Sequence, residues 1–153
     1  MQKIYLGQAS TSFPKAPCTA EAVYRYMTDC GCNVSRGGYA GAYSAEEMVY
    51  ETRVLLCRMF GGSGGAIQPK NVLLTKNVTE SLSILIKGLL RPGDHVLVSS
   101  MEHNAVMRPL VQMEKQGIRF TRVPCAEDGT MDPDEAEARI EAHTKALIML
   151  HAS

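Results

Sequence analysis

The sequence lacks an excess of charge of either sign, because 16 lysines and arginines balance 16 aspartates and glutamates. A balanced chain gives no support for binding to nucleic acid or to an anionic membrane surface. No apolar run approaches the roughly 20 residues of a membrane-spanning helix. The opening residues, MQKIYLGQAS, contain no long apolar signal segment. We therefore expect a cytoplasmic protein with neither a membrane nor a nucleic-acid partner.

Recognisable metal and nucleotide motifs are also absent. The five cysteines are odd in number, and Cys30-Gly-Cys32 does not have the C-x-x-C spacing of redox or zinc pairs. Neither of the glycine-rich nucleotide patterns, G-x-x-x-x-G-K and G-x-G-x-x-G, occurs. We expect no metal site and interpret the cysteines as buried small hydrophobic residues in a reducing compartment.

The chain does have enough apolar residues for a core, since 45% of its 153 residues are hydrophobic. Its most linker-like stretch is GGSGGAIQP, which begins at Gly61. We expect residues 1–68 to form an N-terminal arm with helices over about 19–29 and 44–60. Residues 69–153 are expected to form the first half of a larger domain.

After the linker-like stretch the pattern of apolar residues alternates between strand and helix periods. Such alternation predicts an α/β fold, with parallel strands in βαβ units covered by helices. Strands are predicted over 71–75, 95–99, 118–123 and 145–150, and helices over about 79–90, 105–116 and 133–142.

Polar residues follow three of these predicted strands. KNVTES follows the first, SSMEHN follows the second, and His151 follows the fourth. In open parallel sheets, ligands bind outside the carboxyl ends of the strands. The sequence therefore directs attention to this edge of the sheet, and to Glu102, His103 and Asn104 within it.

Two of these residues have alternative interpretations. Thr79 lies at a predicted helix N-terminus, where free backbone amides of Val78 and Thr79 suit a phosphate, or it is simply the residue that caps the helix. His103 is either an ordinary core histidine or a flat ring that stacks on a phosphorylated heteroaromatic ligand. No second histidine lies at helical spacing, so zinc is not indicated.

A family resemblance favours the ligand interpretations. The segments that carry it are IYLGQASTSFPK, NVSRGGYA, LLTKNVTESLSILIKGLLRPGDHVLVSSMEHNAVMRPL, VPCAEDGTMDPDEAEARI and TKALIMLHAS. In register and with the family's spacing, they resemble the N-terminal portion of the cysteine desulfurases. These belong to the class V aminotransferases, which use pyridoxal 5′-phosphate (PLP) in the fold-type I architecture. The resemblance implies a partial large domain of that fold, with its C-terminal half missing.

The resemblance also implies roles for particular residues. Val78 and Thr79 match the family's phosphate-binding turn, and His103 matches the catalytic histidine that stacks on the pyridine ring. Ala9 and Arg36 match segments near the substrate mouth, with weaker support. Lys76 departs from the usual turn and either assists the phosphate or is a solvated side chain.

The implied reaction converts L-cysteine to L-alanine and leaves sulfur as an enzyme-bound persulfide, as in iron–sulfur cluster assembly. Other class V activities, those of selenocysteine lyases and aminotransferases, remain alternatives, as does a non-catalytic truncated paralogue that acts through a partner chain. A complete version is expected to be a homodimer that passes sulfur to an acceptor protein. The family's Schiff-base lysine and the acid that holds the pyridine nitrogen have no match here. We therefore expect the chain alone to be inactive.

Overall fold

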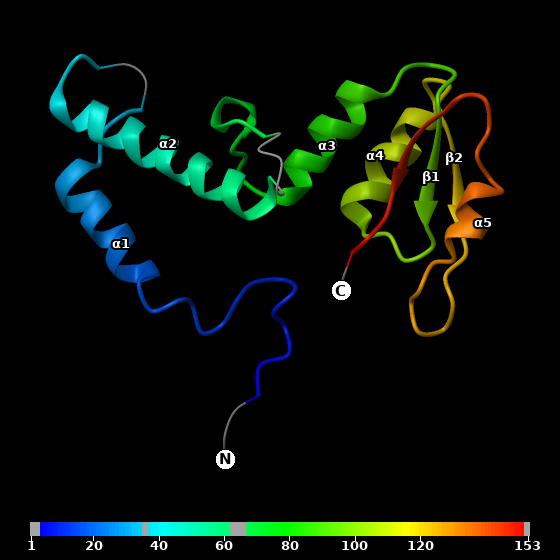
Figure 1. The fold of residues 1–153 in the computed structure, drawn as a ribbon, viewed down its shortest axis with the longest axis horizontal. Helices are drawn as coiled ribbons and strands as arrows, with labels where there is room; N and C mark the ends of the chain where they lie inside the picture. The colour runs from blue at the N-terminus through cyan, green and yellow to red at the C-terminus, as the bar shows by residue number, and fades with distance from the viewer. Residues whose placement is uncertain (1–3, 35–36, 62–66, 152–153) are drawn as a thin grey trace. The chain divides into compact units, whose positions relative to one another are not determined.

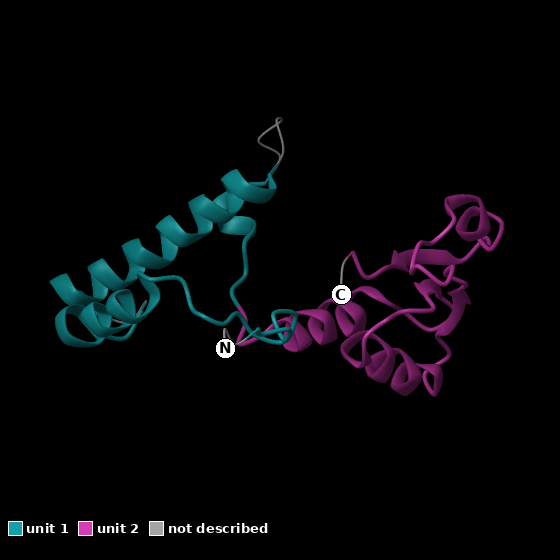
Figure 2. Cartoon of the chain, turned by 90° about the horizontal axis from the view of Figure 1, so that it is seen from below, with its two compact units in different colours: residues 1–74 teal, residues 75–153 magenta. Residues whose placement is uncertain are grey.

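The computed structural model describes residues 4–34, 37–61 and 67–151. The chain divides into two compact units, residues 1–74 (unit 1) and residues 75–153 (unit 2), which Figure 2 colours separately. In the part of the chain that is described, no helix is both long and apolar enough to cross a membrane.

Unit 1 consists of helices joined by extended chain. Its elements are α1 (Thr19–Arg25), a turn of π-helix η1 (Tyr26–Cys30), α2 (Ala40–Phe60) and a short 3-10 helix η2 (Pro69–Asn71). Both predicted helices are confirmed, although α2 begins earlier than expected. The extended backbone of Tyr39 precedes its first turn.

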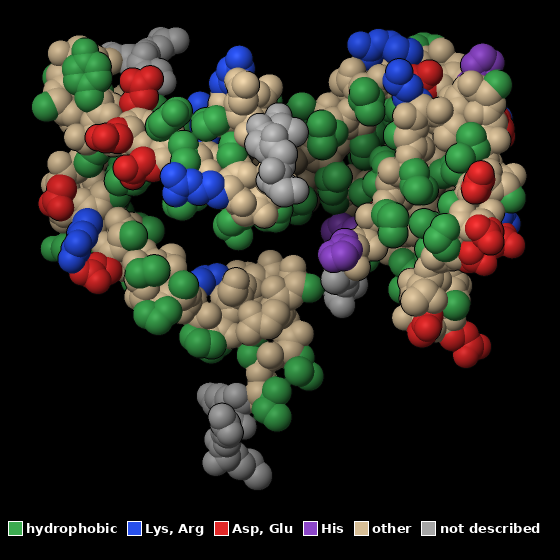
Figure 3. Space-filling view, in the orientation of Figure 1, with side chains coloured by type: hydrophobic (Ala, Val, Ile, Leu, Met, Phe, Trp, Pro, Cys, Tyr) green, Lys and Arg blue, Asp and Glu red, His purple; other side chains and the backbone are tan. Residues whose placement is uncertain are grey.

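Unit 1 buries very little. Within its described residues, only Ala42 and Ala45 are buried, although α2 is 21 residues long. Large apolar side chains such as Met59 and Phe60 stay 72% and 70% exposed. Hydrophobic side chains are accordingly visible over the surface of α1 and α2 (Figure 3).

Unit 2 is built on a parallel sheet of three strands in the order β2-β1-β3 (Figure 1). The strands are β1 (His95–Ser99), β2 (Arg119–Val123) and β3 (Thr144–Ile148). The sequence of β1, HVLVS, is nearly continuous in apolar residues and every one of its residues is buried. This is the expected pattern for a central parallel strand, which has neighbours on both sides and cover on both faces.

Helices cover both faces of this sheet. On one face α3 (Val78–Leu89) and α4 (Asn104–Glu114) enclose the main core. On the other face Leu97 packs with Val123 and with Ala136 of the short α5 (Pro133–Glu137). The buried residues of the main core are Ile86, Leu90, Val96, Val98, Val106, Leu110, Met113 and Ile118.

Two sequence predictions of the fold need correction. The strand expected over 71–75 is absent, because Asn71 ends η2 and residues 72–75 pair with no described strand. Leu73 is 79% exposed there, and a strand without a neighbour leaves its backbone groups unpaired. The helix expected over 133–142 ends at Glu137, and Ile140 beyond it is exposed.

Candidate functional site

The N-terminus of α3 presents two backbone amides that have no hydrogen-bond acceptor among the residues the structure describes. Asn77 caps the helix, because its side-chain oxygen accepts a 2.9 Å hydrogen bond from the Glu80 amide. The backbone oxygen of Asn77 accepts the amide of Ser81 at 3.2 Å. The amides in the first turn of a helix have no acceptor within the helix. Here Asn77 accepts the amides of Glu80 and Ser81, so within the described part of the chain the amides of Val78 and Thr79 are the two that stay without an acceptor at this helix end. Thr79 is therefore not the capping residue.

The loop before α3 is held by side-chain hydrogen bonds. The Glu80 carboxylate accepts the Lys76 amide at 2.9 Å, so it bonds back across the helix start. The hydroxyls of Thr75 and Ser81 lie 2.6 Å apart. Both contacts fix the direction in which the helix end points. Thr79 itself is exposed, and its hydroxyl makes no hydrogen bond among the described residues.

His103 caps the next helix, α4. Its Nδ1 accepts a 3.0 Å hydrogen bond from the Ala105 amide. A neutral ring that accepts at Nδ1 carries its proton on Nε2, so this nitrogen is a donor. The residue is exposed, which excludes an ordinary core histidine.

Thr79 and His103 line the same hollow, which has a volume of about 480 Å³. One row of polar side chains on α3 and another on α4 line it, and the members of each row are four residues apart, as on one face of a helix. Lys87 on α3 and Arg108 on α4 are its charged members, and both are exposed. The hollow therefore favours an anionic ligand. The rows are Thr79, Ser83 and Lys87 on α3, and Asn104, Arg108 and Gln112 on α4.

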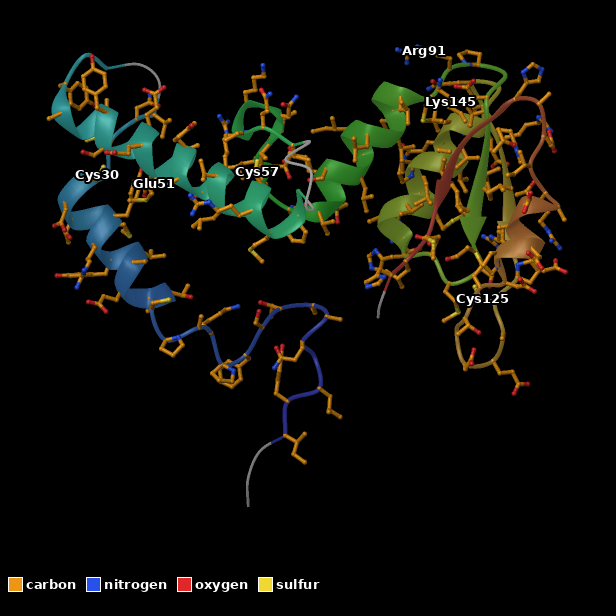
Figure 4. The ribbon with its side chains drawn as sticks, viewed as in Figure 1. Cys30, Glu51, Cys57, Arg91, Cys125 and Lys145 are labelled. Atoms are coloured by element: carbon orange, nitrogen blue, oxygen red, sulfur yellow. The ribbon has the colours of Figure 1, made fainter. Side chains whose placement is uncertain are left out.

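A second hollow, of about 520 Å³, lies where the strands end. Ser99, Cys125 and Leu150 line it, and they follow or end the three different strands. Figure 4 shows Cys125 at the carboxyl end of the sheet and Lys145 toward the opposite end. Asp128 also lines this hollow, and the hydroxyl and amide of Thr130 lower the pKa of its carboxyl by hydrogen bonding to it.

Unit 2 alone builds both of these hollows. Ala9 lies in an exposed turn of unit 1, and Arg36 falls outside the described residues.

No cluster of metal-ligating side chains occurs among residues 4–34, 37–61 and 67–151. All five cysteines are free thiols, but Cys18 is exposed and the other four are half-buried. Most of the cysteines lie in unit 1, which has little core in which to bury them.

Sequence reasoning missed three features of this site. The cap at Asn77 has a readable signal, since Asn with Glu three residues later resembles a capping box. Lys87 and Arg108 could have been found from their helical spacing to Thr79 and Asn104. Glu102 accepts hydrogen bonds from the Ser99 hydroxyl and the Leu150 amide, and these had no such signal because Leu150 is 48 positions away in the sequence.

Known proteins resemble the chain along nearly its whole length. Residues 4–153 match the family described as aminotransferase class-V. Cysteine desulfurase IscS 1 of Archaeoglobus fulgidus is 31% identical over 97% of this chain and 38% of its own length. The chain thus spans less than two fifths of that relative.

Solved structures agree in fold. The apo cysteine desulfurase of Thermococcus onnurineus has a TM-score of 0.76 and 25% identity, over 88% of this chain and 33% of that one. A C-DES mutant with glycine covalently linked to its PLP cofactor has a TM-score of 0.60 and 20% identity, over 86% and 32%. These matches confirm the fold-type expectation, and the family match shows that the chain belongs to the class-V aminotransferases.

Proposed function

We propose that unit 2 supplies the phosphate-binding turn and the ring-stacking histidine of a PLP-dependent cysteine desulfurase. The observation that carries this proposal is the joint placement of Thr79 and His103 on one hollow. One residue brings a helix end with free amides and the other brings an exposed flat ring. Together they suit a ligand that has a phosphate and an aromatic ring.

The phosphate would bind at the start of α3. The amides of Val78 and Thr79 remain after capping by Asn77, and the Thr79 hydroxyl adds a third donor. A helix N-terminus also carries partial positive charge that favours an anion. Each hydrogen bond to a charged group contributes about 1.5–3 kcal/mol. This helix end is therefore suited to hold the ligand by its phosphate.

His103 would contact the pyridine ring. The bond from the Ala105 amide to Nδ1 restrains the imidazole and leaves Nε2 as a proton donor. PLP, when bound, supplies the electron sink for chemistry at the amino-acid substrate. The contribution of His103 is to cover the ring and to hold a proton at Nε2. None of the seven lysines has the family's histidine–lysine context, so the proposal assigns this chain non-covalent contacts only.

The substrate in this proposal is L-cysteine, and the products are L-alanine and a protein-bound persulfide. The support is the name of the Archaeoglobus relative, a cysteine desulfurase of 31% identity. The active form would be a homodimer that delivers sulfur to an acceptor protein. Its location would be the cytoplasm, where reducing conditions keep thiols such as these five free.

Titration of PLP into the chain tests the cofactor assignment. Thr79→Ala should weaken binding by about 10- to 100-fold, because a donor to the phosphate is lost, and Thr79→Ser should restore most of it. His103→Ala should keep part of the affinity but change the absorption spectrum of bound PLP. His143→Ala, at an exposed histidine outside the hollow, is the matched control.

The same titration can refute the proposal. If neither Thr79→Ala nor His103→Ala changes affinity or spectrum, the hollow is not the PLP site. Alanine production from L-cysteine, measured on a version that carries the remaining family segments, tests the reaction class. In that version His103→Ala should lose most of its turnover.

A further inference from the structure

The side chain of Glu102 links the ends of two strands. Its Oε1 accepts a 2.6 Å hydrogen bond from the hydroxyl of Ser99, the last residue of β1. The same oxygen accepts a 2.6 Å hydrogen bond from the amide of Leu150, two residues beyond β3. One oxygen of this half-buried residue thus connects segments 48 positions apart.

This link continues the pairing of β1 and β3 past the end of their ladder. The last register pair of the two strands is Val98 with Ile148. Beyond it, the Leu150 amide has no acceptor on β1, and Glu102 provides one. Ser99 is 4% exposed, so its hydroxyl also needs a partner within the protein. We call these two hydrogen bonds the Glu102 clasp.

The clasp is adjacent to the proposed ring contact. Glu102 precedes His103 directly, and His103 is bonded on its other side to the Ala105 amide. His103 is therefore restrained on both sides: its backbone follows the clasped Glu102, and its ring accepts the Ala105 amide of α4. The backbone amide of Glu102 also donates to the backbone oxygen of Ser99 at 3.4 Å, so the clasp adds a side-chain link to β3 to a turn that is already bonded to β1.

The clasp also joins the two hollows. Ser99 and Leu150 line the hollow at the strand ends, while His103 lines the one beside α3. The clasp therefore lies between residues of the two hollows.

We propose that Glu102 is a positioning residue, which sets the ring of His103 by tying it to the exits of β1 and β3. Its importance for a cofactor rests on the proposed function, in which His103 covers the PLP ring. The clasp itself is present without any ligand, so it can be measured in the cofactor-free chain.

The first experiment uses NMR on the cofactor-free protein. Glu102→Ala should speed hydrogen exchange of the Leu150 amide by about tenfold or more, and should shift or broaden the imidazole signals of His103. The amide of Leu97, at the centre of β1, should keep its protection. Glu102→Gln retains an oxygen acceptor and should restore both signatures, while Ser99→Ala should give an intermediate effect.

Glu114→Ala, at an exposed acid of α4, is the matched control and should change neither signal. Two results would overturn the proposal. One is a Glu102→Ala variant with unchanged Leu150 exchange and unchanged His103 signals. The other is an equal loss of protection at Leu97 and Leu150, since Glu102 would then only stabilise the sheet. If Glu102→Ala does not fold, Ser99→Ala and Glu102→Gln decide the same question.

The second experiment measures PLP affinity in a double-mutant cycle. Glu102→Ala should weaken binding, but adding it to His103→Ala should cost less than about a further twofold, because its effect passes through the ring. An undiminished effect in the His103→Ala background would overturn the positioning role. If the unmodified chain does not bind PLP, the cofactor assignment is refuted. The role of Glu102 is then still decided by the NMR signals of Leu150 and His103 in the cofactor-free protein.

Discussion

Unit 1 and unit 2 both contain helices that carry large apolar side chains, but the units differ in what these helices bury. Within the described residues, unit 1 buries two alanines, whereas unit 2 buries a central strand and the inner faces of α3 and α4. The difference arises because each helix of unit 2 is next to a strand in sequence and can pack on the sheet at once. Among the described residues of unit 1 there is no strand on which its helices could pack.

The comparison teaches where a rigid site can be built. Thr79 and His103 both stand on helix ends anchored to the core of unit 2, whose main cluster includes Ile86 of α3 and Val106 of α4. Ala9, by contrast, lies in an exposed turn of unit 1. Positioning of a ligand to fractions of an ångström requires the first kind of support.

The largest expected effect comes from separating the units. Residues 75–153 should fold alone with a cooperative urea transition, because their hydrophobic clusters are internal to the unit. Residues 1–74 should show no cooperative transition, because little apolar surface is removed from water there. Circular dichroism during urea titration measures both. A cooperative transition in the 1–74 fragment would break the comparison.

A pair of leucine truncations gives the next largest effect. Leu110 of α4 is completely buried, and Leu110→Ala should lower the free energy of unfolding by about 2–5 kcal/mol. Leu55 of α2 is 56% exposed, and Leu55→Ala should change the free energy of unfolding by only about 0.5 kcal/mol or less. Chemical denaturation of both variants provides the measurement. Equal losses would mean that α2 is covered as well as α4.

A pair of threonine variants tests a buried polar link. His95 is fully buried, and its ring nitrogens lie 2.8 Å from the Thr144 hydroxyl and 2.9 Å from the Thr121 hydroxyl. Thr144→Val leaves one ring nitrogen without that partner and should cost about 1–3 kcal/mol. Thr52→Val in α2, which removes an exposed hydroxyl bonded to Met48, should cost little. A negligible effect at Thr144 would show that His95 is satisfied in another way.

The smallest effect concerns pH. The Arg119 guanidinium hydrogen-bonds Glu141 at 2.7 Å and lowers the pKa of that carboxyl below its ordinary value of 4.5. A lowered pKa adds stability above the ordinary value, and this stability is lost as pH falls through the folded-state pKa. Glu141→Gln should therefore be slightly less stable than the unmodified chain at pH 7, and the two should converge toward pH 3.

Urea midpoints at pH 7, 5 and 3 test this pH dependence. Glu46→Gln, at an exposed acid of α2, serves as the control from unit 1. A gap between Glu141→Gln and the unmodified chain that widens at low pH would contradict the assigned sign.

Prediction from sequence succeeded where local pattern and burial agree. The strand over 95–99 has the predicted bounds, because its apolar run is too short for a helix and follows a turn that contains Pro and Gly. The helix that begins at Val78 was predicted to within one residue at each end. The strand over 71–75 failed, although its local pattern is similar, because a strand forms only where another strand pairs with it.

In the candidate site, too, local sequence predicted some features and missed others. Thr79 and His103 were found because they follow apolar segments at points where parallel sheets bind ligands. Their roles toward PLP stay predictions. Asn77 caps the helix, which excludes the alternative that Thr79 is simply its capping residue.

The sequence by itself determined the class of fold, through local periodicity, and the family, through the resemblance of its segments, and it singled out Thr79 and His103 as candidates. Only the tertiary structure decided which strand is central, which helix amides remain free, and that Glu102 joins the exits of β1 and β3. The physical reason is distance along the chain. Hydrogen bonds between residues 48 positions apart depend on strand order and register, and these are set by packing of the whole unit rather than by any local pattern.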